Sequence, residues 1–345
     1  METPLLSVQD LYVEIVTPRG TIAAVDGISF DVAEGEAVGL VGESGCGKSM
    51  TLRAILGLLP RGGRITGGRV LFRGTDLRTL DARKLRDVRG RSISMVFQEP
   101  MTALNPVMPV GEQIAEGPVA HLGVSRRAGR AEALELMRRV GIPDAARRFR
   151  SYPHELSGGL RQRVMIAIAL SSGPQLILCD EPTTALDVTI QDQILKLLLE
   201  LQASSGVGLI FVTHDLAVVS QICTRVSVMY AAQLVENGTV AAVFTEPRHP
   251  YTLGLLRAVP DFDNVKGSLA SIPGIPPDLA SPPDGCRFRA RCDLARDDCS
   301  SGAFPLVAID GGRATACIHW PMVRDAVADS PVIAGNDELR MSSER

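Results

Sequence analysis

The residues best suited to chemistry in this sequence form a glycine-rich run that ends in lysine and serine. Positions 42–49 read Gly-Glu-Ser-Gly-Cys-Gly-Lys-Ser, between an apolar run at 37–41 and a helix-forming run at 50–59. Because glycine has no Cβ and tolerates positive φ, the backbone N–H groups of such a loop can approach phosphate oxygens closely. A helix that begins there would also point its positive end at the anion. The run therefore predicts a phosphate-binding loop.

The members of this loop have different expected roles. Lys48 would add a full positive charge near the β- and γ-phosphates, and Ser49 would offer its hydroxyl to Mg²⁺. The other predicted nucleotide-binding positions are Gly42, Glu43, Ser44, Gly45, Cys46, Gly47 and Met50. The alternative, an incidental glycine-rich turn, is disfavoured by the apolar strand before the run and the helix after it.

Two carboxylates and a histidine follow other apolar runs. The run 175–181 ends in Asp180 and Glu181, and the run 207–214 ends in His214. Continuous apolar runs are typical of parallel strands buried on both faces, and groups at their carboxyl ends lie in the ligand crevice of an α/β sheet. There Asp180 could hold Mg²⁺ through its water shell, and Glu181 could orient or deprotonate a water. A solvated acidic turn and a structural histidine are the alternatives.

Two polar sites are less specific. Gln98 ends the apolar run 92–98, where an ordinary strand-end amide is an equally good interpretation. Ser157, Gly158 and Gly159 stand at the start of an apolar helix, with Ser157 as its cap. The N–H groups at such a helix start could seat a second anion. This pattern usually indicates a plain capped helix. The sequence Leu-Ser-Gly-Gly followed by Arg-Gln-Arg favours an anion-binding site instead.

Length and composition are those of a soluble protein. At 345 residues the chain is long enough for two domains, and 45% hydrophobic with 22% charged residues is ordinary for a globular chain. The formal net charge of −3 argues against broad non-specific nucleic-acid binding. The sequence shows no charged-then-apolar leader and no apolar stretch near the ~20 residues that span a bilayer. We expect a cytoplasmic protein whose membrane role must come through a partner.

Four of the seven cysteines cluster in the last quarter of the chain, in a segment rich in proline and glycine. They are Cys286, Cys292, Cys299 and Cys317. In a chain without an export signal, such a cluster suggests a metal site more than disulfides. Four thiolates suit a [4Fe–4S] cluster or a structural zinc, and free or disulfide-bonded cysteines are the third interpretation. A small segment with few large apolar residues needs a metal site or a cross-link to stabilise its fold.

Strands and helices alternate along most of the chain, as expected for an α/β fold with a parallel sheet. The apolar patterns predict strands within 5–41 and at 70–72, 92–98, 175–181, 207–214, 226–230 and 233–235. They predict helices at 50–59, within 110–150, at 164–170 and at 188–203. The dipeptide Asn237-Gly238 predicts a tight turn after the last of these strands.

Together these motifs resemble the ATP-binding subunit of ABC transporters over about residues 5–260. The residues that carry the resemblance are 42–49, Gln98, 156–162, 176–181, 185–187 and His214. The resemblance implies an α/β P-loop NTPase fold with a RecA-like core and an antiparallel β subdomain. It also implies a helical subdomain at about 100–163, all within an ATP-binding domain at 1–250. A small Cys-rich C-terminal domain at 251–322 would follow, and the composition predicts a disordered tail at 323–345.

Within that family the sequence is similar to the oligopeptide/dipeptide branch. Sequence motifs typical of this branch lie at 42–49, 97–106, 182–191, 249–252 and 272–277 and in the cysteine cluster. The resemblance implies an ATP hydrolase coupled to import of di- or oligopeptides, and it favours iron–sulfur for the four thiols. Importers of nickel, glutathione, an opine or a sugar, and soluble ABC ATPases without a permease, are the alternatives. The soluble class usually carries two such domains or a long coiled coil, whereas this sequence shows neither an internal repeat nor sustained heptads.

The resemblance also implies roles that need an assembly. Two ATP-binding subunits would enclose two ATP molecules in their seam, with Ser157–Gly159 of one subunit on the γ-phosphate held by the other. Asp187 would communicate across the seam, and Gln98 would contact both Mg²⁺ and the permease. His214 would hold the attacking water together with Glu181. Ser157, Gly158, Gly159, Asp187, Gln98 and His214 thus join the loop, Asp180 and Glu181 as predicted site residues.

The cofactors implied are ATP and Mg²⁺, the latter with Ser49, Gln98 and Asp180 as its ligands. The partners implied are a second ATPase subunit, by preference a paralogue, two transmembrane permease subunits and an extracytoplasmic substrate-binding protein, with no nucleic acid. The chain would then lie on the cytoplasmic face of the cell membrane.

One feature departs from the family, which usually stacks an aromatic side chain on adenine near the end of the first strand. That region reads Glu14-Ile-Val-Thr17 here and Tyr12 lies too early, so the adenine platform is unassigned.

Overall fold

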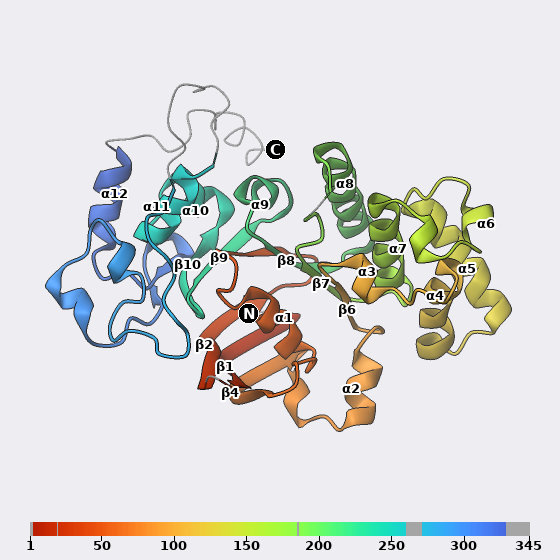
Figure 1. The fold of residues 1–345 in the computed structure, drawn as a ribbon, viewed down its shortest axis with the longest axis horizontal. Helices are drawn as coiled ribbons and strands as arrows, with labels where there is room; N and C mark the ends of the chain where they lie inside the picture. Colours follow the sequence, from red (N-terminus) through yellow and green to blue (C-terminus); the bar gives the residue numbers. More distant parts are fainter. Residues whose placement is uncertain (1–2, 19, 185, 260–270, 329–345) are drawn as a thin grey trace.

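The strands of the computed structural model form two sheets, which position the predicted site residues (Figure 1). The structure describes residues 3–18, 20–184, 186–259 and 271–328. The strands are β1 (Leu6–Thr17), β2 (Gly20–Val32), β3 (Ala37–Val41), β4 (Gly63–Phe72), β5 (Thr75–Asp76), β6 (Ile93–Val96), β7 (Leu176–Asp180), β8 (Gly208–Thr213), β9 (Arg225–Tyr230), β10 (Gln233–Thr239), β11 (Val307–Ala308) and β12 (Ala314–Thr315). Within the described residues, a four-stranded antiparallel sheet has the order β2-β1-β4-β5, and an eight-stranded sheet has the order β11-β12-β10-β9-β3-β8-β7-β6.

The centre of the larger sheet consists of parallel strands in the order β9, β3, β8, β7 and β6. Every residue of β3, β7 and β8 is buried. Burial on both faces explains why these runs are continuously apolar rather than alternating. The glycine-rich loop follows β3, the acidic pair ends β7, and His214 follows β8. Because parallel strands end at the same edge, the three predicted groups meet there.

The hairpin between β9 and β10 differs from the prediction. Its turn is Ala231-Ala232, with φ of 45° and 71°. The turn predicted at Asn237-Gly238 is wrong, because β10 continues through these residues and Gly238 pairs with Val226. A Cβ on Gly238 would lie 2.8 Å from the side chain of Arg313. The glycine therefore allows close packing against the strand rather than a change of direction.

Helices cover both faces of the larger sheet. They are α1 (Lys48–Ile55), α2 (Ala82–Val88), α3 (Pro100–Ala103), α4 (Val110–Gly117), α5 (Arg126–Arg139), α6 (Ala145–Arg148), α7 (Gly158–Leu170), α8 (Val188–Ser205), α9 (Leu216–Ile222), α10 (Val240–Thr245), α11 (Pro250–Arg257) and α12 (Trp320–Ala328). Short 3-10 turns lie at Leu77–Thr79, Pro153–Glu155, Arg289–Arg291, Asp297–Ser300 and Asp310–Gly312, and a π turn at Pro118–Leu122. The helix α7 starts at Gly158 with Ser157 as its N-cap, so the predicted cap is confirmed and the helix includes residues before its apolar run at 164–170.

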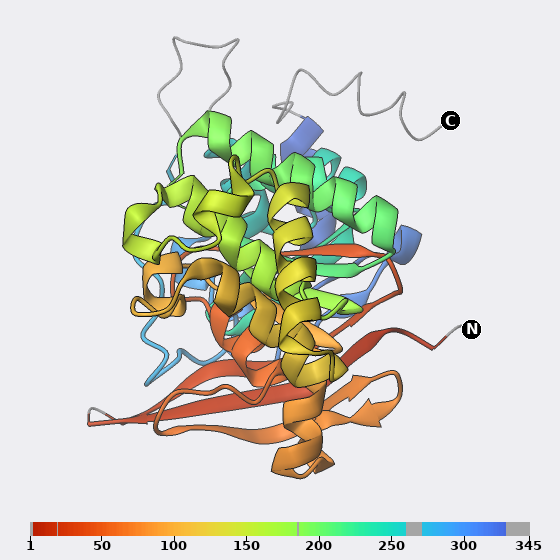
Figure 2. The ribbon, with the colours of Figure 1, turned by 90° about the vertical axis from the view of Figure 1, so that its right-hand side faces the viewer.

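The elements separate into three groups around the larger sheet. Helices α4 to α7 lie beyond β6 at one end, and the C-terminal elements lie beyond β10 at the other, with the antiparallel sheet below (Figure 1). Figure 2 views the helical end and shows these helices above the antiparallel sheet. Alternate residues of β8 belong to two hydrophobic cores, with Leu209 and Phe211 in one and Ile210 and Val212 in the other. The sheet is thus packed on both faces, one of them against the antiparallel sheet.

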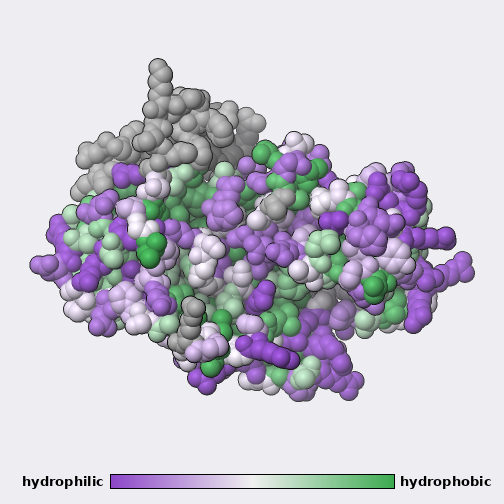
Figure 3. Space-filling model, in the orientation of Figure 1, coloured by the Kyte–Doolittle hydropathy of each residue, from purple (hydrophilic) through white to green (hydrophobic). Residues whose placement is uncertain are grey.

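Polar and apolar side chains are interspersed on the face shown in Figure 3, and polar ones prevail at the end where α5 and α6 lie. Among the described residues, no helix combines the length and the apolar character that crossing a bilayer requires.

The described C-terminal residues 271–328 are joined to the ATP-binding fold rather than set apart from it. The strand β12 extends the larger sheet, with Thr315 opposite Glu236 of β10. Residues 323–328 were predicted to begin a disordered tail, but they continue α12. The remainder of that predicted tail, 329–345, lies outside the described residues.

Candidate nucleotide-binding and catalytic site

The loop 42–49 connects β3 to α1 in a conformation that requires glycine at two positions. Gly42 has a φ of 153°, and a Cβ there would lie 2.1 Å from the carbonyl oxygen of Met229. Gly47 has a φ of 112°, and a Cβ there would lie 2.3 Å from the carbonyl oxygen of Ala24. Both the backbone conformation and the neighbouring main chain therefore exclude a side chain, as predicted for a loop whose backbone forms the binding surface.

Lys48 lies along the inside of this loop. Its side chain is buried, and Nζ donates hydrogen bonds to the carbonyl oxygens of Gly42, at 2.7 Å, and Glu43, at 2.9 Å. The ammonium group is thus held over the concave side of the loop by neutral acceptors, without a carboxylate partner among the described residues. A phosphate oxygen placed there would meet a full positive charge.

Ser49 and Asp180 bring two oxygen ligands together at the edge of the sheet. The Ser49 hydroxyl donates to Oδ1 of Asp180 at 2.7 Å, which joins the start of α1 to the end of β7. Burial raises the pKa of Asp180, while the hydrogen bond from Ser49 acts in the opposite direction. A hydroxyl and a carboxylate at this separation are the hard oxygen donors that Mg²⁺ prefers, so the pair fits the predicted ion.

Glu181 is the centre of the predicted catalytic group. Its Oε2 accepts hydrogen bonds from Gln98 Nε2, at 3.0 Å, and from the Thr184 hydroxyl, at 2.9 Å. Its Oε1 lies 3.5 Å from Nδ1 of His214. The backbone of Glu181 has a φ of 45°, an unusual value for a residue with a side chain, and its N–H donates to Val212 at 3.0 Å. Strained backbone of this kind is concentrated at functional sites.

The structure therefore brings Gln98, Glu181 and His214 together as predicted, and it adds Thr184, which the sequence reasoning missed. Thr184 lies within the Pro-Thr-Thr-Ala-Leu-Asp run after β7, and Ala185 of that run lies outside the described residues. Its position three residues after Glu181 could have indicated this contact, because a hydroxyl at that spacing can donate a hydrogen bond back to the carboxylate across a turn.

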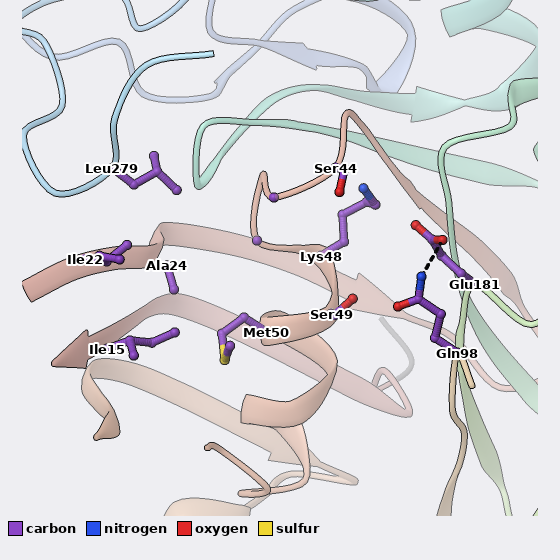
Figure 4. A pocket seen from close by; sticks show the side chains of 12 residues that line it. Ile15, Ile22, Ala24, Ser44, Lys48, Ser49, Met50, Gln98, Glu181 and Leu279 are labelled. Carbon is purple, nitrogen blue, oxygen red and sulfur yellow. Dashed lines mark hydrogen bonds between the residues drawn. The ribbon is translucent and has the colours of Figure 1, made fainter. Parts of the chain in front are cut away.

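A cavity of about 270 Å³ joins Gln98 and Glu181 to the loop (Figure 4). Its lining residues are Ile15, Ile22, Ala24, Ser44, Gly45, Gly47, Lys48, Ser49, Met50, Gln98, Glu181 and Leu279. Gly42, Glu43 and Cys46 were also predicted to bind nucleotide, but they do not line it. Gly42 and Cys46 are buried members of the loop, and the Glu43 carboxylate pairs with Arg291 instead.

The remaining predicted residues lie apart from the cavity. Ser157 caps α7 by accepting from Leu160 N at 3.4 Å, and Asp187 caps α8 by accepting from Ile190 N at 2.9 Å. A Cβ on Gly159 would lie 2.7 Å from the Ile190 side chain, so the two caps are neighbours. Within one chain, the serine–glycine motif is not among the residues that line the cavity.

Glu43 is fixed by two residues from the last third of the chain. Arg291 forms two parallel bonds to its carboxylate, Nη1 to Oε2 at 2.6 Å and Nη2 to Oε1 at 2.9 Å. The Tyr251 hydroxyl accepts the Glu43 backbone N–H at 2.8 Å. The hydrogen bonds that Arg291 donates to Glu43 raise the pKa of Arg291, which therefore stays charged. No local pattern indicated either partner, apart from the motif His-Pro-Tyr-Thr at 249–252 and the basic character of the cysteine segment.

The four C-terminal cysteines lie in one region of the structure. Burial raises the pKa of Cys292 to about 11 and that of Cys317 to about 12, and the other thiols of the group act in the same direction. The Cys286 N–H also donates to the carbonyl oxygen of Cys299 at 2.9 Å. No three of these four sulfurs approach within 4.8 Å of one another, all four being described residues. Cys299 instead has Asp298 and the His319 ring within that distance.

Strand, glycine-rich loop, helix and the acidic end of the neighbouring strand together define a P-loop nucleoside triphosphatase. The comparisons with known proteins are more specific. Residues 25–184 match the ABC transporter family, and residues 235–299 match the C-terminal region of oligopeptide/dipeptide transporters.

Relatives and solved structures agree with these matches. The dipeptide transport ATP-binding protein DppD of Bacillus subtilis is 52% identical over 84% of this chain and 86% of that protein. A Brucella melitensis protein named for peptide import is 49% identical over 92% and 97%. A dimeric ATP-binding cassette bound to ADP and phosphate superimposes with a TM-score of 0.62 at 28% identity, over 68% of this chain and 98% of that one. The chain belongs to the ATP-binding subunits of ABC transporters.

Proposed function

We propose that this chain is the ATP-binding and hydrolysing subunit that energises an ABC importer for di- or oligopeptides. The observation that carries the chemistry is the position of Glu181, beside the Mg²⁺-type pair Ser49 and Asp180 and in contact with Gln98 and His214. The peptide assignment is supported by the match at 235–299 and by the relatives, which are named for dipeptide transport and peptide import.

In this proposal the chain's own groups divide the work of phosphoryl transfer. Lys48 and the loop N–H groups hold the β- and γ-phosphates, and Ser49, Asp180 and Gln98 would hold Mg²⁺, which neutralises the charge that develops on the oxygens. Glu181 orients a water and accepts its proton, while His214 fixes that water from the other side. The bonds from Gln98 and Thr184 keep the Glu181 carboxylate at the edge of the cavity.

A second ATP-binding subunit completes the site. The N-terminus of α7 at Ser157–Gly159 lies outside the cavity of its own chain, which supports its use by a partner's nucleotide. Asp187, next to that motif, would then lie in the same seam. A paralogue as that partner, two permeases and an extracytoplasmic binding protein at the cytoplasmic face of a membrane belong to the same proposal.

Two variants test the chemistry. Glu181→Gln should lower the rate of phosphate release at least ~100-fold, because general bases contribute about 10²–10⁴, while ATP binding persists. Lys48→Ala should instead weaken binding itself. The measurement is ATP affinity and phosphate release for each full chain reconstituted with its permeases, with and without dipeptides and oligopeptides. Normal turnover by the Glu181 variant would contradict the catalytic assignment, and turnover indifferent to peptides would contradict the substrate.

We also propose that Cys286, Cys292, Cys299 and Cys317 hold a [4Fe–4S] cluster. Four neighbouring thiols fit soft metals. A tetrahedral zinc with Zn–S bonds of about 2.3 Å would draw its sulfurs to about 3.8 Å from one another. No three of the four sulfurs lie within 4.8 Å of one another, and this supports the iron–sulfur alternative. Iron and acid-labile sulfide in the anaerobically purified chain, both lost in Cys292→Ser, are the expected result, and stoichiometric zinc without sulfide would contradict it.

A further inference from the structure

The cavity beside the phosphate loop has two chemically different ends. Its polar end contains Lys48, Ser49, Gln98 and Glu181. Its other end is lined by apolar side chains, from Ile15, Ile22, Ala24, Met50 and Leu279. Figure 4 shows this second group on the side of the loop away from Gln98 and Glu181, with Leu279 entering from a separate segment. A ligand that spans the cavity therefore has one charged and one apolar end.

Leu279 comes from the C-terminal segment, whereas the other apolar lining residues come from β1, β2 and the start of α1. Its carbonyl oxygen accepts the backbone N–H of Ala23 in β2 at 3.3 Å. Pro276 and Pro277, just before it, face the loop residues 43–46 across a small space of about 40 Å³. The segment 276–279 thus follows the outer side of the phosphate loop to the apolar end of the cavity.

Two arginines further along the chain fix this part of the molecule, and one of them, Arg291, donates to the carbonyl oxygens of Ile272 and Pro273 just before the segment. Arg287 forms an ion pair with Asp26, which extends from β2, and it also donates to the Ala231 carbonyl in the β9–β10 turn. Arg291 forms the two-bond pair with Glu43 of the loop. Both arginine side chains are largely buried. Leu279 therefore sits on a segment anchored at both β2 and the phosphate loop, rather than on a free loop.

No aromatic side chain takes this place among the residues that line the cavity. Tyr12 of β1 lies elsewhere, packed over two glycines. A Cβ on Gly67 would lie 2.9 Å from the Tyr12 ring, and one on Gly27 would lie 2.9 Å from its hydroxyl. The apolar end of the cavity therefore depends on aliphatic side chains, and Leu279 is the one supplied by a distant part of the chain.

We infer that Leu279 is a base-binding residue, which forms one wall of an aliphatic slot for the base of the nucleoside triphosphate. The inference rests on the proposed placement of the phosphates at Lys48 and Ser49. With the phosphates there, the nucleoside extends toward the apolar end. The faces of a base are apolar, so contact with Leu279, Ile15 and Met50 removes apolar surface from water and stabilises the bound state. The C-terminal segment thereby takes part directly in nucleotide binding.

The test compares ligands that do and do not carry a base. Affinities of the full-length chain for Mg-ATP and for Mg-tripolyphosphate are measured by calorimetry for wild type, Leu279→Ala, Leu279→Phe and Ile275→Ala. Ile275 lies directly before this segment but is 86% exposed and does not line the cavity, so its variant is the matched control. Lys48→Ala reports on the phosphate end.

Leu279→Ala should weaken ATP binding about five- to tenfold and leave tripolyphosphate binding within about twofold, since the latter has no base. Unchanged tripolyphosphate binding also shows that the loop is intact. Leu279→Phe should match or exceed wild type, because a ring presents more apolar surface, and Ile275→Ala should match it. Equal losses for both ligands, or no loss for either, would overturn the role of Leu279. If Lys48→Ala also left ATP binding unchanged, the proposed site itself would be wrong.

Discussion

Removal of the Arg291 side chain is the change that most directly tests how the C-terminal segment supports the phosphate loop. The guanidinium is 4% exposed and pairs with a Glu43 carboxylate that is 28% exposed. It also donates to the carbonyl oxygens of Pro273, at 2.8 Å, and Ile272, at 3.3 Å. Arg291→Ala removes all of these bonds at once and leaves an unpaired carboxylate in a loop built to bind anions.

The magnitude follows from that geometry. Breaking a fully buried ion pair costs about 3–5 kcal/mol, because the remaining charge is left without a partner. Glu43 is partly exposed and can regain water, so we take the lower end, about 3 kcal/mol, as the loss in unfolding free energy. ATP affinity should fall about tenfold, or ~1.4 kcal/mol, because the unpaired Glu43 carboxylate now repels the triphosphate. Glu43→Gln combined with Arg291→Ala should recover most of the ATP affinity.

The assay is a double-mutant cycle over wild type, both single variants and the double variant. Urea unfolding can be followed by Trp320, the single tryptophan of the chain, which lies at the start of α12 and stacks on Arg248 at 5.0 Å. A coupling energy of about 2 kcal/mol between the two positions is expected for charges in direct contact. A coupling energy below about 0.5 kcal/mol, or no recovery of ATP affinity in the double variant, would refute the argument.

Two further predictions concern the loop and a buried carboxylate. Gly42→Ala should reduce ATP affinity at least about tenfold, because its Cβ would collide with the Met229 carbonyl. Gly74 is the control, since it has a φ of 77° but no atom within 4 Å of the position of a Cβ. Gly74→Ala should lower the free energy of unfolding by about 1 kcal/mol and leave ATP affinity unchanged. Burial raises the pKa of Glu236 from 4.5 to about 7. A raised pKa favours the folded state most below pH 4.5, and that contribution is lost as the pH rises through 7. Urea unfolding should therefore show wild type losing at most about 3 kcal/mol between pH 4.5 and 8 relative to Glu236→Gln, and parallel profiles would contradict this.

The parts of the fold that were predictable are those in which a local rule coincides with the tertiary requirement. The strand–loop–helix at 37–55 is one. Its buried strand, its glycine-rich loop and the start of its helix are each indicated by a run of consecutive residues. The meeting of Glu181, Gln98 and His214 is another, since parallel strands that end in polar residues must present them at one edge. The start of α7 is a third, because Ser157 is a favoured N-cap residue and caps this helix.

The parts that were not predictable depend on partners far away in the sequence. Tyr251 and Arg291 lie 208 and 248 positions after Glu43, and no local pattern ties either one to the loop. The Ala231-Ala232 turn shows the same limit, because neither alanine is a usual residue for positive φ. Its geometry is stabilised from outside, by the bond from Ala232 N to the Cys46 carbonyl at 2.9 Å and by Arg287 on the Ala231 carbonyl.

Glu43 shows how such a partner can be suspected before a structure exists. A carboxylate inside an anion-binding loop conflicts with the purpose of that loop, and conflicts between local chemistry and function indicate a compensating contact elsewhere. The compensation must be a cation that is held firmly and that stays charged, which favours a buried arginine with two parallel bonds over a mobile lysine. Arg291 meets both conditions. The same stretch of chain also carries Leu279 and Cys292, so it reaches the phosphate loop, the apolar end of the cavity and the group of four cysteines.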